Sequence, residues 1–224
     1  MTAHALMLFA AGFGTRMGAL TADRPKPLIE VAGRPLIDHA LDLIGPVVTG
    51  PVVANLHYRA DQLEAHLAGT RVTTLREEPE ILETGGGLRN ALPLLGDGPV
   101  FTMNSDAVWR GPNPLRLLAE AWREDMEALL LGIPPAQAVG HAGAGDFTPG
   151  PPVARGPGLI YSGVQIIRTE GLADIGADAF SLNLLWDRML ERGGLHILPY
   201  PGEWCDVGHP EGITLAEEML ARDV

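Results

Sequence analysis

The first chemically suggestive feature of the chain is a glycine turn with two cations close behind it. Residues 8–17 read LFAAGFGTRM, and the tripeptide PKP follows at residues 25–27. The apolar run 5–9 predicts a buried strand that ends at the turn. Glycines let the backbone approach a ligand without a Cβ in the way, and they leave consecutive N–H groups free to face anionic oxygens. With Arg16 and Lys26 nearby, the turn is suited to hold a nucleoside triphosphate.

Two familiar phosphate-binding patterns do not fit this turn. The dinucleotide fingerprint G-x-G-x-x-G begins well with Gly12 and Gly14, but its third glycine falls on Met17. The P-loop pattern fails as well, because no G-K-[ST] follows. An NAD-binding or flavodoxin-like domain is therefore the weaker interpretation.

Two aspartates lie far apart in the sequence but in similar settings. Asp106 follows the predicted strand 100–104, so its carboxylate is expected at that strand's carboxyl end, in the same crevice as the glycine turn. Asp206 lies in the segment WCDVG at residues 204–208, before a predicted helix. Mg²⁺ prefers one or two carboxylates together with waters and phosphate oxygens, so the pair is a suitable ligand set. Taken singly, each aspartate is more typical of a cap or turn.

A second glycine-rich segment, ETGGG at residues 83–87, precedes a helical pattern that continues to Leu95. One interpretation is a loop in which Thr84 caps the helix. The other is functional: Gly85 to Gly87 let the backbone lie flat against a base or ribose, while Glu83 accepts a hydrogen bond. Both interpretations remain open from the sequence.

Together, GFGTRM at residues 12–17 and the PKP tripeptide resemble the signature of the sugar-nucleotide nucleotidyltransferases. The form LETGGG at residues 82–87 is most similar to the small uridylyltransferases that act on N-acetylmuramate 1-phosphate. The resemblance implies one nucleotidyltransferase domain over residues 1–224. It also implies Mg²⁺-dependent transfer of a nucleotidyl group from a nucleoside triphosphate, here UTP, to a sugar 1-phosphate. For these uridylyltransferases the biological role is peptidoglycan recycling.

The resemblance also implies roles for individual residues. Lys26 is expected near the attacking phosphate and Arg16 on the leaving pyrophosphate, with Asp106 as the third catalytic residue; Asp106 and Asp206 match the metal positions. The nucleotide side comprises Ala11, Gly12, Gly14, Thr15, Arg16, Glu83, Gly85 and Gly86. The acceptor side comprises Asn104, Asp146, Ser162, Gly163 and Asn183, of which Asp146 also fits a turn and Asn183 a helix start. Ser105 replaces the glycine that is more common in the family.

Apolar runs and helical spacings alternate along the chain and must position these residues. Strands are predicted at residues 5–9, 52–56, 71–75, 100–104, 128–133, 159–167 and 195–198, with helical spacing at 37–44, 88–95, 182–190 and 213–220. This alternation predicts an α/β fold with a mostly parallel sheet. The resemblance narrows it to a single-domain Rossmann-like three-layer sandwich with a mostly parallel mixed sheet, the nucleotide-diphospho-sugar transferase fold. Residues 140–158 break the rhythm and predict a long loop, which leaves open whether they close over the acceptor.

Composition narrows the partners. A chain of 224 residues with 46% hydrophobic residues suits one domain, and its net charge of −12 argues against nucleic acid or an acidic membrane surface. No run approaches the ~18 apolar residues of a membrane span. The single Cys205 and the absence of a leader-like N-terminus favour the cytoplasm. We expect a monomer or weak homodimer.

The remaining conspicuous residues are interpreted as structural. Trp186 and Met189 lie at helical spacing and are expected in the core, and the glutamates 77, 78 and 80 are expected in a solvated loop. His57 lies at a strand end and is a weaker candidate for the pocket. The seven histidines show no zinc-site spacing.

Several functions stay open from the sequence. Within the same enzyme class, the sequence also fits transfer from UTP, GTP or dTTP to another hexose 1-phosphate. It fits transfer from CTP to phosphocholine as well. A nucleotide-binding regulatory module without catalysis is the alternative from another class. Loss of Lys26 or of one aspartate would favour that module, but all three are present.

Overall fold

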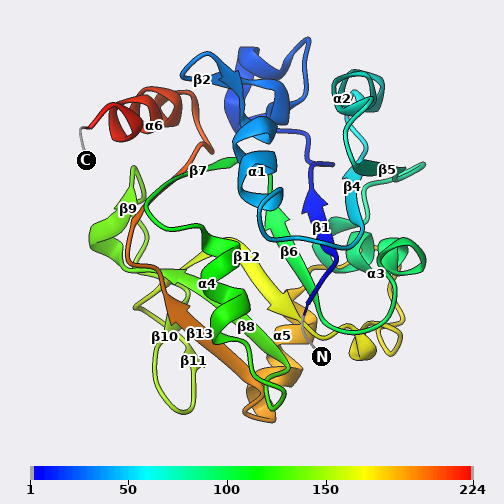
Figure 1. Ribbon diagram of the computed structural model, residues 1–224, viewed down its shortest axis with the longest axis vertical. Coiled ribbons are helices and arrows are strands. Elements are labelled where there is room, and N and C mark those ends of the chain that lie inside the picture. The colour runs from blue at the N-terminus through cyan, green and yellow to red at the C-terminus, as the bar shows by residue number, and fades with distance from the viewer. Residues whose placement is uncertain (1–2, 223–224) are drawn as a thin grey trace.

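The computed structural model describes residues 3–222 and centres on a seven-stranded sheet (Figure 1). Its strand order is β13-β8-β12-β6-β1-β4-β5. The strands are β1 (Leu6–Phe9), β4 (Val52–Leu56), β5 (Val72–Arg76), β6 (Val100–Asn104), β8 (Ala128–Ile133), β12 (Ile160–Ile167) and β13 (Leu195–Pro199). Only β12 runs antiparallel to its neighbours within this sheet, so the predicted mixed, mostly parallel sheet is confirmed.

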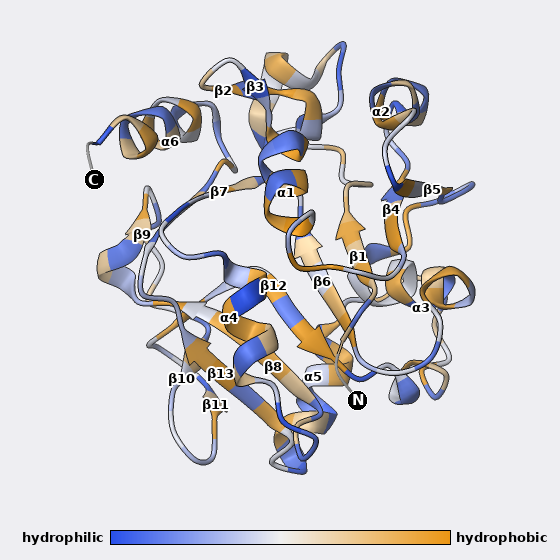
Figure 2. Cartoon of the chain, viewed as in Figure 1, coloured by the Kyte–Doolittle hydropathy of each residue, from blue (hydrophilic) through white to orange (hydrophobic). Residues whose placement is uncertain are grey.

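Helices cover both faces of the sheet because side chains alternate along each strand. In β1, Leu6 and Leu8 join an apolar cluster beneath α1 (Leu36–Ile44), α2 (Ala60–Leu67) and α4 (Pro114–Ala121). Met7 points to the other face, where α3 (Glu83–Leu95) and α5 (Asn183–Glu191) pack. Figure 2 shows the strands as predominantly hydrophobic, as expected for a sheet buried on both faces. The predicted three layers are confirmed, and Trp186 and Met189 lie in the core.

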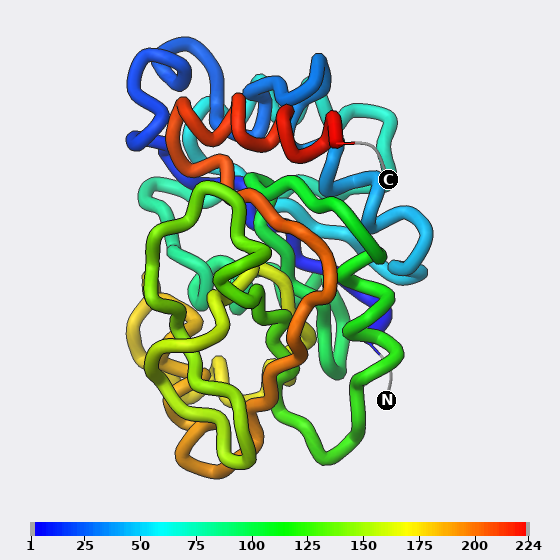
Figure 3. The backbone as a smooth tube through the Cα atoms, turned by 90° about the vertical axis from the view of Figure 1, so that its left-hand side faces the viewer, coloured from blue at the N-terminus to red at the C-terminus, as the bar shows by residue number. Residues whose placement is uncertain are grey.

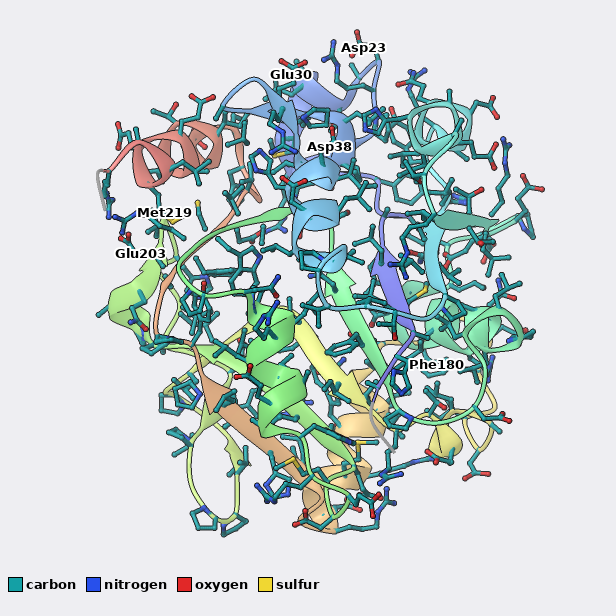
Figure 4. The ribbon with its side chains drawn as sticks, viewed as in Figure 1. Asp23, Glu30, Asp38, Phe180, Glu203 and Met219 are labelled. Atoms are coloured by element: carbon teal, nitrogen blue, oxygen red, sulfur yellow. The ribbon has the colours of Figure 1, made fainter. Side chains whose placement is uncertain are left out.

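A smaller, three-stranded sheet pairs the strand that follows β6 with a strand from the C-terminal part of the chain. It consists of β7 (Ala107–Arg110), β14 (Glu203–Asp206) and β9 (Ala138–Val139), in the order β7-β14-β9. α6 (Pro210–Ala221) packs beside it, with Met219 fully buried on the inner side of the helix (Figure 4). In Figure 3 the red α6 lies beside the blue segment that follows β1. Two chain regions about 190 residues apart thus share one apolar cluster.

Short elements complete the chain. They are the 3₁₀ turns η1 (Thr15–Thr21), η2 (Lys26–Leu28), η3 (Pro135–Gln137) and η4 (Glu170–Leu172), and the strands β2 (Glu30–Val31), β3 (Arg34–Pro35), β10 (Phe147–Thr148) and β11 (Ala154–Arg155). None of the helices within residues 3–222 has the length and apolar character needed to cross a bilayer.

The predicted long loop at 140–158 needs correction. It contains the β10–β11 hairpin, and Phe147 is completely buried with its ring edge against Trp186. The glycines and prolines that surround this residue hide the signal, because strands of two residues show no alternation. Phe147 and Val153 both belong to the apolar cluster that includes Trp186, so two apolar residues tie the segment to the core.

Candidate active site

A cavity of about 290 Å³ opens at the carboxyl ends of β1, β4 and β6, the edge where ligands bind in open α/β sheets. We call it the nucleotide hollow. Most residues predicted for the nucleotide and for catalysis line it: Ala11, Gly12, Gly14, Thr15, Arg16, Lys26, Glu83 and Asp106. Asn104 and Thr84 line it as well. The fold thus brings together side chains from four distant segments.

The glycine turn uses its two glycines differently. Gly14 has a φ of 65°, and a Cβ there would lie 2.8 Å from Cβ of Lys26. The turn is fixed from within, because the Thr21 hydroxyl and the Met17 N–H both donate to the Gly14 carbonyl. Gly12 is exposed, and a Cβ there would meet no atom within 4 Å. Gly14 is therefore required by the turn itself, while Gly12 leaves space at the hollow.

Lys26 is held rigidly beside Asp106. It lies in η2 between two prolines, its residue is 7% exposed, and its Nζ donates to Oδ2 of Asp106 at 2.7 Å. Arg16 is exposed on η1, and its guanidinium packs so closely on Gly208 that a Cβ there would lie 3.2 Å from one guanidinium nitrogen. A buried ammonium and an exposed planar fork thus approach the hollow from the same turn region.

The two aspartates meet because β14 pairs antiparallel with β7. Asp206 lies opposite Ala107, and the Val207 N–H donates to the Asp106 carbonyl at 3.0 Å. Burial raises the pKa of Asp206 and the neighbouring charge of Asp106 raises it further, against the lowering effect of Lys26, Arg16 and His141. Two carboxylates in this setting favour a bound cation. Within residues 3–222 no group of three metal-binding side chains gathers, and Mg²⁺ needs only one or two carboxylates from a protein.

Ser105 takes the place of a glycine without backbone strain. Its φ is not among the positive values of the chain. Its hydroxyl donates to the Phe9 carbonyl at 2.7 Å, and its side chain is buried. This bond fastens the Asp106 turn to the end of β1.

A second cavity of about 190 Å³ adjoins the first and shares Arg16, Asn104 and Asp106 with it. We call it the acceptor hollow. It gathers four of the five residues predicted for the acceptor side, Asn104, Asp146, Ser162 and Gly163, and adds Asp206, His141 and Trp204. The pairing of β12 with β8 shifts register between Tyr161 and Gln165, the part of the strand that contains Ser162 and Gly163. Gly163 has a φ of 84°, and a Cβ there would lie 2.7 Å from Nδ2 of Asn104.

Asp146 and Asn183 are already engaged inside the protein. The Asp146 carboxylate accepts from the Tyr161 N–H at 2.7 Å. Asn183 is exposed at the start of α5, where its Oδ1 accepts from Arg155 at 2.9 Å, and it lines neither hollow. Asn183 is thus the one predicted acceptor residue that the fold does not bring to the site, because Arg155 holds it toward the β10–β11 hairpin.

The second glycine-rich segment differs from the interpretation as a loop that Thr84 caps. α3 already begins at Glu83, so Gly85 to Gly87 are helical, and Thr84 is not its cap. The hydroxyl of Thr84 instead accepts from the Leu182 N–H at 3.0 Å. The N–H groups of Gly85 and Gly86 both donate to the Phe180 carbonyl, at 2.8 and 3.1 Å. A Cβ on Gly85 would lie 2.4 Å from the Phe180 ring. These two glycines make room for the segment that crosses the helix start, and their contact with a nucleotide stays a prediction.

Sequence reasoning missed two buried polar residues at the hollow. Asn55, the last residue but one of β4, lines the hollow and is 3% exposed; Glu77 follows β5 and is 1% exposed. The expectation of a solvated loop is wrong for Glu77, because its oxygens accept from the Asn55 amide and the Leu82 N–H at 2.7 and 2.8 Å. Its exposed neighbours Glu78 and Glu80 fit that expectation. The available signal was a polar residue at the end of an apolar strand.

His57 lies outside the site. Its Nδ1 bonds with the Glu77 carbonyl at 2.8 Å, and its ring contacts Phe13 edge-on at 5.3 Å. It lines a separate cavity on the far side of Glu77.

Comparison with known proteins gives a consistent result. Residues 6–149 match the family described as the MobA-like NTP transferase domain. The chain is 39% identical to the N-acetylmuramate alpha-1-phosphate uridylyltransferase of Caulobacter vibrioides over 96% of each chain. It is 31% identical to the protein of the same name from Neisseria meningitidis, over 90% of this chain and 92% of that one. In fold it is similar to HddC from Yersinia pseudotuberculosis complexed with GMP-PN, with a TM-score of 0.76, 21% identity, and coverage of 97% and 99% of the two chains.

Proposed function

Because the chain belongs to the family of MobA-like NTP transferase domains and is a nucleotidyltransferase acting on sugar 1-phosphates, we propose that its substrates are UTP and N-acetylmuramate 1-phosphate. The products are UDP-N-acetylmuramate and pyrophosphate. Support for this acceptor comes from the two relatives of that name, which match nearly the whole chain. The observation that carries the chemistry is the convergence of Arg16, Lys26, Asp106 and Asp206 at one sheet edge.

The reaction needs no dedicated base. A phosphate monoester has its second pKa near about 6, so the acceptor is largely a dianion at neutral pH. Its oxygen forms a bond to the α-phosphorus of UTP, and the bond from that phosphorus to the bridging oxygen of pyrophosphate breaks. The obstacle is repulsion between two anions, so catalysis rests on positioning and on electrostatic stabilisation.

The cations of the site divide this task. Lys26 is fixed by its proline neighbours and by Asp106. Its charge is therefore preorganised to stabilise the attacking phosphate. Arg16 is exposed and free to grip the leaving pyrophosphate as a planar fork. The backbone of the open turn from Ala11 to Gly14 seats the nucleoside and its phosphates.

Asp106 and Asp206 would hold a Mg²⁺ ion. The fit rests on two adjacent carboxylates, one of them buried enough to have a raised pKa, beside the hollow that takes the phosphates. When bound, the ion would neutralise charge on the phosphate oxygens. Lys26 occupies one oxygen of Asp106, which leaves the other oxygen and Asp206 as ligands.

The acceptor hollow is assigned to the sugar. Asn104, Ser162 and Gly163 line this hollow, and Asp146 contributes the carboxylate oxygen that does not bond to the Tyr161 N–H. In this role the enzyme converts N-acetylmuramate 1-phosphate, derived from the cell wall, into UDP-N-acetylmuramate. We place that reaction, peptidoglycan recycling, in the cytoplasm and expect a monomer or weak homodimer.

A pyrophosphate-release assay tests the proposal. The purified protein is combined with UTP, GTP, dTTP or CTP and with N-acetylmuramate, N-acetylglucosamine, glucose or mannose 1-phosphate or phosphocholine, with Mg²⁺ or with a chelator. We expect release with UTP and N-acetylmuramate 1-phosphate, dependent on Mg²⁺ and absent in Asp106→Asn. Activity confined to another acceptor would remove the muramate assignment and keep the enzyme class. Full activity in the chelator would remove the metal assignment.

A further inference from the structure

We propose that Glu77 is a positioning residue for the nucleotide: it touches no substrate but fixes two walls of the nucleotide hollow through Asn55 and Leu82. The identity of the nucleotide rests on the proposed function, whereas the positioning role rests on the contacts described below.

A chain of hydrogen bonds connects the ends of three neighbouring strands. After β1, the Ala10 N–H donates to Oδ1 of Asn55 at 3.0 Å. At the end of β4, Nδ2 of Asn55 donates to Oε1 of Glu77 at 2.7 Å. After β5, Oε2 of Glu77 accepts from the Leu82 N–H at 2.8 Å, immediately before α3. One carboxylate thus ties the ends of β1 and β4 to the start of α3.

These groups are cut off from water. Ala10, Asn55 and Glu77 are each less than 5% exposed. A buried carboxylate is costly unless it is fully hydrogen-bonded. Gly87 shows how closely the chain is fitted here, because a Cβ at this position would lie 2.6 Å from Oε1 of Glu77 and 2.9 Å from Nδ2 of Asn55. The third glycine of the second glycine-rich segment therefore makes room for this carboxylate.

The carboxylate fixes the direction of every bond in the chain. An inverted Asn55 amide would point its oxygen at Glu77 and its NH₂ group at the Ala10 N–H, so both contacts would become repulsive. Only a group that accepts at both oxygens suits two donors, the Asn55 amide and the Leu82 N–H. Glu77 is therefore required as a double acceptor.

Both ends of this series of hydrogen bonds lie at the nucleotide hollow. Ala10 and Asn55 line it on one side, and Glu83 and Thr84 line it just beyond Leu82. Glu83 has a φ of 59°, which a residue with a Cβ rarely adopts, so its backbone needs support from the preceding N–H bond. The acceptor hollow includes none of these residues. Loss of the double acceptor should therefore weaken nucleotide binding and leave acceptor binding almost unchanged.

A reciprocal swap tests this polarity. In Glu77→Gln the NH₂ group of the new side chain must face one of two donors, the Asn55 amide or the Leu82 N–H. In Asn55→Asp the introduced carboxylate faces that of Glu77. In the double variant Asn55→Asp with Glu77→Gln every donor again meets an acceptor, since the introduced glutamine donates to the introduced aspartate and accepts from the Leu82 N–H. The exposed neighbour Glu78→Gln is the matched control for charge.

Titration calorimetry with UTP and Mg²⁺, and KM values for nucleotide and acceptor, give the readout. We expect each single variant to bind UTP at least ~10-fold more weakly, the double variant to recover to within ~5-fold of wild type, and Glu78→Gln to match wild type. Simple charge effects predict otherwise, because Glu77→Gln removes a negative charge and would strengthen phosphate binding, while Asn55→Asp would weaken it. The acceptor KM and kcat should change less than ~3-fold.

Each other result overturns the inference. Unchanged UTP affinity in both single variants, a loss that the double variant does not recover, or equal increases in both KM values would each reject it. Should a single variant not fold, the double variant decides, since it must fold and bind UTP within ~5-fold of wild type. If the wild type binds another nucleoside triphosphate and not UTP, the proposed nucleobase fails, and the same variants measured with that nucleotide still test Glu77.

Discussion

Two glycine-rich segments border the same hollow, and the fold uses them in opposite ways. In the turn after β1, Gly12 is exposed and a Cβ there would meet nothing. At the start of α3, Gly85, Gly86 and Gly87 are buried, and a Cβ on any of them would collide with Phe180, Asp178 or Glu77. Figure 4 shows Phe180 beside α3. At Gly12 the first segment leaves open space at the hollow, whereas the three glycines of the second segment make room for other parts of the protein.

The two glycine-rich segments therefore differ in what surrounds them. Glycine alone does not reveal which use applies, because both uses need a missing Cβ. The neighbours decide: cations follow the first segment, whereas a crossing segment and a buried carboxylate pack on the second. Substitutions at the open turn and its charged partners should therefore change turnover or binding. Substitutions at the packed helix start should change stability.

The largest effect is expected from the charged partners of the open turn. Lys26→Met keeps the side-chain stem that packs on Gly14 but removes the charge, and Asp106→Asn keeps the shape but removes the carboxylate. Each should lower kcat by at least ~10²-fold, about 2.7 kcal/mol of transition-state stabilisation, because a preorganised electrostatic group is lost. Pyrophosphate release measures the rate, and circular dichroism checks the fold. Wild-type turnover in either variant would break the assignment of chemistry to this side.

A large loss of stability is expected at the packed segment. Gly85→Ala gains helix propensity, but its Cβ would lie 2.4 Å from the Phe180 ring, and such overpacking costs about 1–3 kcal/mol. For a domain of this size the Tm should fall by roughly 3–10 °C. The control is Gly176→Ala, in the segment before Phe180, where a Cβ would meet no atom within 4 Å. Its free energy of unfolding should stay within about 0.5 kcal/mol of wild type. Equal Tm values for the two variants would contradict the packing argument.

The reverse behaviour is expected at Gly12. Gly12→Ala should change the free energy of unfolding by less than about 0.5 kcal/mol, since nothing surrounds the new methyl group. The nucleotide KM should nevertheless rise by roughly 10-fold, equal to about 1.4 kcal/mol of binding, because the methyl group occupies the space left for the ligand. Steady-state kinetics and thermal unfolding of one preparation test both halves. A Tm loss like that of Gly85→Ala would erase the distinction between the two segments.

The smallest expected effect is a gain in stability at the site. Asp206 is half-buried beside the like charge of Asp106, and both effects raise its pKa, so its charge opposes folding of the metal-free protein. Asp206→Asn should raise the Tm without Mg²⁺ by roughly 2–4 °C, about 1 kcal/mol, while turnover falls. Thermal unfolding in the presence of a chelator measures it. A lower Tm for the variant would show that the carboxylate stabilises the fold and would weaken the case for a cation here.

Much of the architecture was predictable because each strand is a compact apolar run bounded by turn residues. β1, β4, β6 and β8 fall within a residue of their predicted bounds, and the glycine turn with Lys26 and Asp106 lies where strand ends meet. β7 and β14 were not predicted, since four-residue strands around a single aspartate carry little periodicity. Their pairing is nevertheless what brings Asp206 to Asp106.

The wrong predictions share a cause. Glu77 was interpreted as a surface acid and Thr84 as a helix cap because each was judged by its sequence neighbours. Their actual partners, Asn55 and Leu182, lie 22 and 98 residues away. Local propensity contains no information about such partners. A polar residue closing an apolar strand, as Asn55 does, is the one local sign that could have pointed to this buried network.

The pairing of β14 with β7 has a consequence for the order in which the molecule is made. A ribosome delivers the glycine turn, Lys26 and Asp106 first, within the first half of the chain. The second carboxylate arrives only 100 residues after the first, on β14, the central strand to which both β7 and β9 pair, so this sheet cannot form before β14 is made. Until β14 is made, Asp206 cannot lie beside Asp106, so the proposed metal site is the last part of the active site to be completed.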